Sequence, residues 1–184
     1  MSNYVKIKNF SIENGEGIRT SIFFSGCEFF CRGCFNKDIQ DFNVGKPFTK
    51  EVYENEIKPT INEHIAGISV LGGEPLHPRN VLATWLLTTW FKGDFPKKSI
   101  WLWSGYTWEE LMDIMVQDCE TYSSSWHCQQ RLRKILENID ILVDGRFVER
   151  EKDLTLKWRG SKNQRVISVQ QSLAQKKVVL YDER

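Results

Sequence analysis

Residues Arg19–Cys34, RTSIFFSGCEFFCRGC, combine the feature that sets the fold of this chain with the feature that sets its chemistry. The first part, Arg19–Gly26, is rich in β-branched and aromatic residues and ends in a glycine, which predicts a buried strand followed by a turn. Three cysteines follow at once, at Cys27, Cys31 and Cys34. The sequence therefore places a candidate metal-binding loop at the carboxyl end of a strand.

Further strands are predicted on either side of helical patterns along the rest of the chain. Two buried strands are expected at Gly67–Gly73 and Lys98–Tyr106, and a fourth strand at Asp140–Val148. Two late apolar runs, Arg165–Gln170 and Lys176–Glu183, predict edge strands near the C-terminus.

Helical patterns fill the intervals between these strands. The stretch 49–65 has helical spacing that Pro59 should break, and Pro78 should open a buried helix through Lys92. Thr107 with Glu110 matches a capping box, which predicts a helix start there and an end near residue 117. A further helix is predicted over 129–139.

Strand followed by helix, four times over, predicts a mainly parallel sheet with helical crossovers. A closed eight-stranded barrel takes roughly 250 residues, and this chain has 184. We therefore expect an α/β fold, an open or partial (β/α) barrel, formed by a single domain over residues 1–184. Ligands of such sheets gather beyond the carboxyl ends of the strands, where the cysteine loop and the GGEP sequence of Gly72–Pro75 both fall.

Composition narrows the classes of partner and the cellular compartment. The near-balance of 25 basic and 24 acidic side chains argues against a broad nucleic-acid or membrane-binding face. The first ten residues lack the apolar core of a secretory signal, and the longest apolar stretch, Val81–Phe91, is shorter than the ~20 residues of a membrane span. We expect a cytoplasmic protein whose five cysteines are reduced.

The spacing C-x-x-x-C-x-x-C lets three thiolates converge on one metal centre. A structural zinc ion is closed by four protein ligands. A cubane iron-sulfur cluster instead has four irons, and each iron takes one further ligand. Three cysteines would leave one iron open for a substrate or cofactor. A zinc site completed from elsewhere, three buried free thiols and a simple electron carrier are the alternatives on spacing alone.

The cysteine triad after the first of these strands and GGEP after the second resemble the radical S-adenosylmethionine (SAM) enzymes. A wider set of stretches resembles, in order and spacing, the activating proteins of anaerobic ribonucleoside-triphosphate reductases, a family of glycyl radical enzyme activases. The set comprises Asn14–Asn36 (NGEGIRTSIFFSGCEFFCRGCFN), Leu71–Leu76 (LGGEPL), Trp101–Leu111 (WLWSGYTWEEL), Asp140–Phe147 (DILVDGRF) and Arg159–Ile167 (RGSKNQRVI).

The resemblance implies a [4Fe-4S] cluster held by Cys27, Cys31 and Cys34, with SAM chelating the fourth iron through its amino and carboxylate groups. An electron from the reduced cluster would cleave the S–C5′ bond, giving methionine and a 5′-deoxyadenosyl radical. That radical would take a hydrogen atom from a backbone glycine of the large reductase subunit. The resemblance also implies an electron donor such as flavodoxin, and another glycyl radical enzyme such as pyruvate formate-lyase is the alternative target.

Site residues follow from the same resemblance. The segment Gly72, Gly73, Glu74 and Pro75 is expected to contact the methionyl amino group, and Gly33, Cys34 and Phe35 to touch SAM. Ser104, beside Gly105, and Asp144 end the third and fourth strands, where they are expected to face the ribose or the carboxylate, although ordinary turn chemistry fits them equally. The adenine is expected to rest on Phe35 or Phe30.

Three further groups receive weaker assignments. The basic run Lys157, Arg159, Lys162 and Arg165 is expected to be a solvated loop, with docking of the partner or of a SAM carboxylate as the alternative. Cys119, His127 and Cys128 are expected to be incidental, because no further ligand for a second metal site is adjacent. The seven tryptophans are expected to fill the core.

Overall fold

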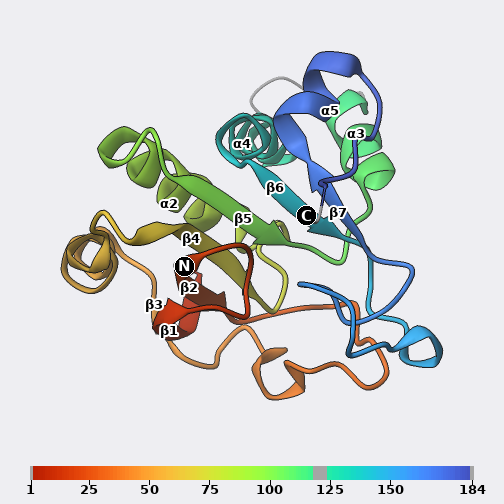
Figure 1. Ribbon diagram of the computed structural model, residues 1–184, viewed down its shortest axis with the longest axis horizontal. Coiled ribbons are helices and arrows are strands. Elements are labelled where there is room, and N and C mark those ends of the chain that lie inside the picture. Colours follow the sequence, from red (N-terminus) through yellow and green to blue (C-terminus); the bar gives the residue numbers. More distant parts are fainter. Residues whose placement is uncertain (1, 118–123, 183–184) are drawn as a thin grey trace.

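The computed structural model describes residues 2–117 and 124–182, which form one seven-stranded sheet with helices packed on it (Figure 1). The strand order across the sheet is β3-β1-β2-β4-β5-β6-β7. The strands are β1 (Asn3–Ser11), β2 (Ile18–Phe24), β3 (Lys46–Pro47), β4 (Ile65–Gly72), β5 (Ser99–Trp103), β6 (Ile141–Asp144) and β7 (Arg165–Ser168).

The four central strands β2, β4, β5 and β6 are parallel, as the sequence predicts. Both flanks are antiparallel, with β1 paired to β2 and β3 on one side and β7 paired to β6 on the other. The expected mainly parallel α/β sheet is therefore confirmed for its centre. In the described part of the chain the sheet is open, because β3 and β7 stand at its two ends and do not pair.

Helical segments connect the strands: η1 (Lys37–Ile39), α1 (Lys50–Val52), η2 (Tyr53–Ile57), η3 (Lys58–Thr60), α2 (Val81–Asp94), α3 (Trp108–Val116), α4 (Ser124–Asn138), η4 (Glu149–Glu151) and α5 (Val169–Gln175). The predicted break at Pro59 is confirmed, since the stretch splits into three short turns. The capping box is also confirmed: Glu110 N donates to Thr107 Oγ1 and Thr107 N donates to Glu110 Oε2. Among the described helices, none has the length and apolar character to cross a membrane.

The prediction for the C-terminal stretch is wrong in two respects. The strand expected over Arg165–Gln170 ends at Ser168, and α5 begins at the next residue. The stretch from Lys176 forms no strand in its described part and makes only an isolated bridge between Leu180 and Ile167. A left-handed turn at Lys176 sends the tail back along β7, where too few ladder bonds form to make a strand.

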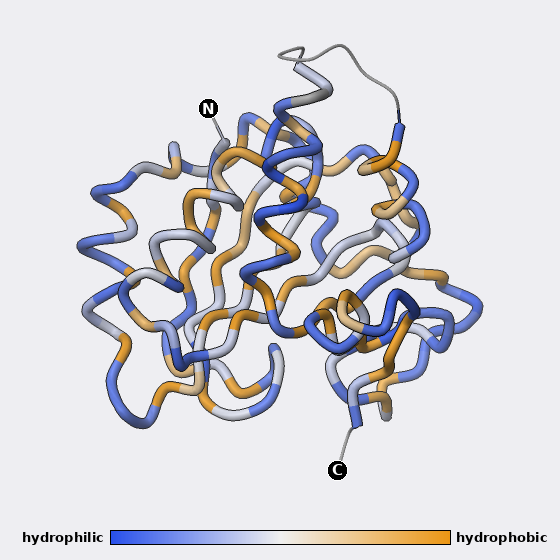
Figure 2. Tube along the Cα trace, turned by 90° about the horizontal axis from the view of Figure 1, so that it is seen from above, coloured by the Kyte–Doolittle hydropathy of each residue, from blue (hydrophilic) through white to orange (hydrophobic). Residues whose placement is uncertain are grey.

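One face of the sheet carries the main core. Alternating residues of the parallel strands point to this face, as the period-two geometry of a strand requires, and α2 and α4 cover them (Figure 1). Figure 2 shows apolar residues concentrated along the central strands and hydrophilic residues on the outer segments. Core members include Ile22, Val70, Leu102, Leu142, Leu87, Phe91, Leu132 and Ile135.

The opposite face carries a smaller aromatic cluster and a buried arginine. Trp101 lies at its centre, with Trp158 edge-on at 4.8 Å and Tyr181 edge-on at 5.4 Å between ring centroids. Tyr181 comes from the C-terminal tail and donates a hydrogen bond to Glu16. The tail thereby covers the end of this face where the parallel strands begin.

Arg19 of β2 is fully buried on the same face and joins three strands. Its guanidinium donates to Ser69 Oγ at 2.8 Å, to Ile68 O at 2.7 Å and to Ser99 O at 2.8 Å. The remaining N–H groups reach Ser99 Oγ and Glu16 O, so all five donors have acceptors. Burial lowers the pKa of Arg19 to about 10, which still leaves it charged at neutral pH.

Candidate functional site

A pocket of about 530 Å³ lies at the carboxyl ends of the parallel strands. This volume is in the range of small-molecule and cofactor sites. It opens where α/β sheets bind their ligands, and residues that follow β2, β4, β5 and β6 line it. Those that bear on the expected chemistry are Cys27, Cys31, Cys34, Gly73, Glu74 and Ser104.

The three cysteines of the loop after β2 all line this pocket and are free thiols. Cys27 is 9% exposed, while Cys31 and Cys34 are half-buried. The loop is folded back on itself by backbone bonds, with Cys27 N donating to Gln40 O at 2.9 Å and Cys34 N to Cys31 O at 3.2 Å. Asn36 N donates to Cys34 Sγ at 3.4 Å. All three cysteines thus border one pocket, and their joint ligation of one metal centre stays a prediction.

Burial governs the protonation of these thiols. It raises the pKa of Cys27 to about 11, and it also raises the pKa of Cys31. Both thiols are therefore protonated at neutral pH in the metal-free chain. Because the thiolate is the form that binds a metal, loading of iron would displace these protons. Three sulfur donors facing one pocket fit an iron-sulfur cluster with one corner left for another ligand.

The end of β4 packs against the start of the cysteine loop. Gly73 N donates to Phe24 O at 2.8 Å, and Glu74 N donates to Gly26 O at 2.7 Å. A Cβ on Gly73 would lie 2.3 Å from Gly26 O, so only glycine fits there. Asn36 adds a third tie through a 3.0 Å bond from its amide to Gly72 O. The close approach that requires glycine at position 73 is to the chain's own backbone, and the expected contact of Gly73 with the methionyl amino group stays a prediction.

Glu74 links the end of β4 to the loop after β5. Its carboxylate is 1% exposed and accepts from Leu76 N at 2.8 Å, Ser104 Oγ at 2.9 Å and Gly105 N at 2.6 Å. Burial raises the pKa of Glu74 to about 7, although these three bonds oppose the rise. Ser104 also accepts from Tyr106 N at 3.1 Å, so its hydroxyl is engaged within the protein. A contact of Ser104 with SAM stays a prediction.

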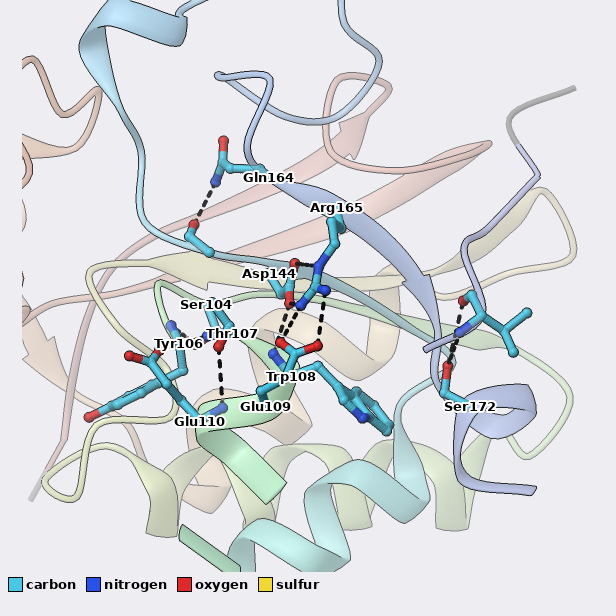
Figure 3. A network of polar contacts seen from close by, with 12 residues as sticks. Ser104, Tyr106, Thr107, Trp108, Glu109, Glu110, Asp144, Gln164, Arg165 and Ser172 are labelled. Atoms are coloured by element: carbon cyan, nitrogen blue, oxygen red, sulfur yellow. Dashed lines mark hydrogen bonds and ion pairs between the residues drawn. The ribbon is translucent and has the colours of Figure 1, made fainter. Parts of the chain in front are cut away.

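Asp144, at the end of β6, holds a polar network beside the pocket (Figure 3). Its carboxylate is 1% exposed and accepts from Trp108 N at 2.8 Å and from Arg165 Nη2 at 2.5 Å. Arg165 also donates to Glu109 Oε2 at 2.7 Å. Asp144 is not among the residues that line the pocket. The network ties β6, β7 and the start of α3 together, and the expected contact of Asp144 with a ligand stays a prediction.

Other predicted residues divide between the pocket and its surroundings. Phe35 lines the pocket and packs against Phe147, with ring centroids 5.1 Å apart, whereas Phe30 is 69% exposed and does not line it. Gly33 and Pro75 also lie outside the lining. Of the two candidates for the adenine support, the pocket therefore contains Phe35.

Phe29 and Arg146 are among the lining residues that the sequence reasoning missed. Phe29 lines the pocket, and the Arg146 guanidinium lies over its ring at 4.4 Å from the centroid. Arg146 also donates to Glu110 Oε1 at 3.0 Å. Phe29 packs edge-on against Tyr106 at 4.9 Å. Both residues lie inside motifs quoted for the family resemblance, but a contact between residues more than one hundred positions apart leaves no local signal.

The basic run and the cysteines outside the triad lie in different parts of the structure. Arg159 lines the pocket, whereas Arg165 is held by the acidic network. Cys119 lies outside the described residues, while His127 and Cys128 lie in α4. Across residues 2–117 and 124–182, no three Cys, His, Asp or Glu side chains are grouped to hold a single metal ion.

Known proteins match this chain over most of its length. A family model described as a 4Fe-4S single cluster domain matches residues 13–167. The chain is 40% identical over 156 residues to the anaerobic ribonucleoside-triphosphate reductase-activating protein of Salmonella typhimurium, covering 83% of this chain and 90% of the relative. The protein of that name from Escherichia coli K12 is 38% identical over 164 residues, covering 88% and 96%.

A more distant relative comes from a virus. The anaerobic ribonucleoside-triphosphate reductase-activating protein of Enterobacteria phage T4 is 32% identical over 168 residues, covering 90% of this chain and 94% of the relative. The motifs, the cysteines that border the pocket and these matches agree, and the chain belongs to the family of anaerobic ribonucleoside-triphosphate reductase-activating proteins.

Proposed function

We propose that this chain binds a [4Fe-4S] cluster through Cys27, Cys31 and Cys34, binds SAM in the same pocket, and installs a glycyl radical on an anaerobic ribonucleoside-triphosphate reductase. The names of its relatives and the cluster-domain match support the target and the cofactor. The observation that carries the proposal is that three sulfurs line one pocket together with the Gly73–Glu74 backbone. When bound, the cluster and SAM supply one-electron cleavage of the sulfonium.

The chain's own residues bind, orient and enclose in this proposal. The cysteine loop supplies the three sulfurs to the wall of the pocket. Hydrogen bonds from the backbone of Gly73 and Glu74 to the start of this loop fix it against the end of β4. Glu74 keeps the Ser104–Gly105 turn against the same wall. Phe29 and Phe35 contribute apolar surface, which limits access of water to the reacting atoms.

The wider setting is part of the same proposal. The target is the large reductase subunit, the electron comes from a small donor such as flavodoxin, and the reaction takes place in the cytoplasm. The open sheet is proposed to be a radical SAM barrel that leaves one side accessible to a protein substrate.

The test reconstitutes the protein without air using iron and sulfide, then adds SAM, dithionite and the reductase. The expected results are 5′-deoxyadenosine and a doublet glycyl radical signal in electron paramagnetic resonance. Cys31→Ala should abolish both, while Cys128→Ala, which removes a half-buried thiol of α4, should retain both. A colourless protein that holds only zinc, or a Cys31→Ala variant that still cleaves SAM, would overturn the proposal. A radical on pyruvate formate-lyase alone would reassign the target.

A further inference from the structure

The segment Glu149–Lys162 after β6 forms a flap at the mouth of the pocket. Lys152 and Ser161 form an antiparallel bridge, Asp153 N donates to Gly160 O at 3.1 Å, and Lys162 N donates to Glu151 O at 2.9 Å. The hydroxyl of Ser161, which is fully buried, accepts from Val148 N at 3.2 Å and anchors the base. These bonds give the flap a defined shape instead of that of a loose loop.

The flap is fastened to the cysteine loop. Glu149 accepts from Arg32 at 2.8 Å, and the Lys152 ammonium lies 5.2 Å from the centre of the Phe35 ring. Gly160 fits closely under the same ring, since a Cβ there would be 2.8 Å from Phe35. The two segments lie side by side in Figure 1, the cysteine loop in orange and the flap in light blue. They form two walls of one opening.

The tip of the flap exposes an apolar side chain at this opening. Leu154 is 76% exposed and is one of the residues that border the pocket. Phe35, on the opposite wall, is 60% exposed. Exposed apolar surface that is gathered in one place marks interaction sites, and both of these side chains border the same pocket.

The flap also concentrates positive charge. Residues 149–162 contain five basic and three acidic side chains, a net charge of +2, whereas the whole chain has a net charge of only +1. A positively charged rim favours a partner segment with acidic residues, both by attraction at a distance and by discrimination against basic segments.

We propose that the flap is the docking surface for the reductase: Leu154 packs on an extended, glycine-bearing segment of that partner, and the basic side chains of the flap face acidic residues beside it. This inference rests on the proposed function, because a backbone glycine reaches the pocket only if its chain passes the opening.

The test measures radical formation against reductase concentration, with dithionite as the reductant so that no donor protein is involved. Leu154→Asp should raise the KM for the reductase about tenfold, the effect of losing one interface anchor, while the rate at saturating reductase stays near that of the parent protein. Val116→Asp is the matched control, because Val116 is 74% exposed at the end of α3 and does not line the pocket. It should leave the KM unchanged.

Charge is tested separately with a second pair of variants. Lys162→Glu should raise the KM several-fold at low salt, and the difference should shrink in 0.5 M salt because of screening. Lys134→Glu, an equally exposed change on α4, should not affect the KM. An unchanged KM in Leu154→Asp, or a fall in the saturating rate alone, would overturn the flap assignment. Absence of SAM cleavage in the parent protein would instead overturn the proposed function.

Discussion

Gly73 packs the end of β4 against the start of the cysteine loop. We predict that Gly73→Ala separates these segments, because its Cβ would meet the Gly26 carbonyl at 2.3 Å. Overpacking of this kind costs about 1–3 kcal/mol. The variant should therefore lose bound iron as well as SAM affinity, measured as iron per chain after reconstitution and as the free energy of unfolding.

Gly93 provides the control for this prediction. It lies in α2, and a Cβ there would meet no atom within 4 Å. Gly93→Ala should stabilise the protein by up to about 1 kcal/mol, since alanine loses less backbone entropy in a helix. Full iron content in Gly73→Ala would contradict the assigned role of Gly73.

The raised pKa of Glu74 predicts that the free energy of unfolding depends on pH. Its pKa of about 7 in the folded chain lies above the ordinary value, so the folded state binds the proton more tightly than the unfolded state. The stabilisation is complete below about pH 4.5 and is lost as the pH rises through 7. Urea unfolding of the iron-free protein should therefore show that its stability advantage over Glu74→Gln narrows between pH 5 and pH 8. A constant or widening gap would contradict this prediction.

At this scale the sequence identifies chemistry better than geometry. The cysteines and the GGEP sequence were found because their spacing is local. The sequence did not predict that these two segments contact each other, or that this contact is the reason for glycine at Gly73. Residues almost fifty positions apart meet only in the folded sheet. Phe29 and Arg146 were missed for the same reason.

Between elements, the Asp144 network fixes the start of α3 against β6 and β7. We predict that Asp144→Ala destabilises the fold by about 3 kcal/mol, since it leaves Trp108 N without its acceptor and Arg165 without its buried partner. Glu109→Ala removes the other, 58% exposed partner of Arg165 and should cost less than about 1 kcal/mol. Thermal unfolding of both variants tests this, and equal losses would contradict it.

Elements with strong local signals were predicted correctly. The capping box at Thr107 and the break at Pro59 each rest on chemistry within a few residues. The strand β1 was missed because lysines interrupt its apolar pattern, and its partner β3 is only two residues long. The boundary between β7 and α5 was misplaced because Val169 continues a strand-like pattern while its backbone already turns into the helix.

For the molecule as a whole, Arg19 holds the centre of the sheet. We predict that Arg19→Met destabilises the protein by at least about 3 kcal/mol, because the acceptors on β4 and β5 lose their donors in a buried place. Arg19→Lys should recover only part of the loss, since an ammonium has three donors where five are used. The measurement is urea unfolding, and a change within 1 kcal/mol for Arg19→Met would contradict the prediction.

The overall architecture was predictable in its centre and not at its margins. Alternating strands and helices predicted the parallel core, and chain length predicted that the sheet stays open. The antiparallel flanks depend on the pairing of β1 with β2 and of β7 with β6, which propensity does not encode. The tryptophans were expected to fill the core: Trp101 and Trp108 are buried in the two apolar clusters, whereas Trp103 and Trp158 line the pocket.

The residues that form the cysteine loop and its contacts with β4 and β5 precede the flap in the sequence. Its bonds to Gly73 and Glu74, and those of Glu74 to Ser104 and Gly105, all fall within the first 105 residues, whereas the flap comes from residues 149–162. A ribosome releases the nascent chain from its N-terminus. The segments that form the sulfur-bearing wall are thus synthesised before the flap that narrows the entrance.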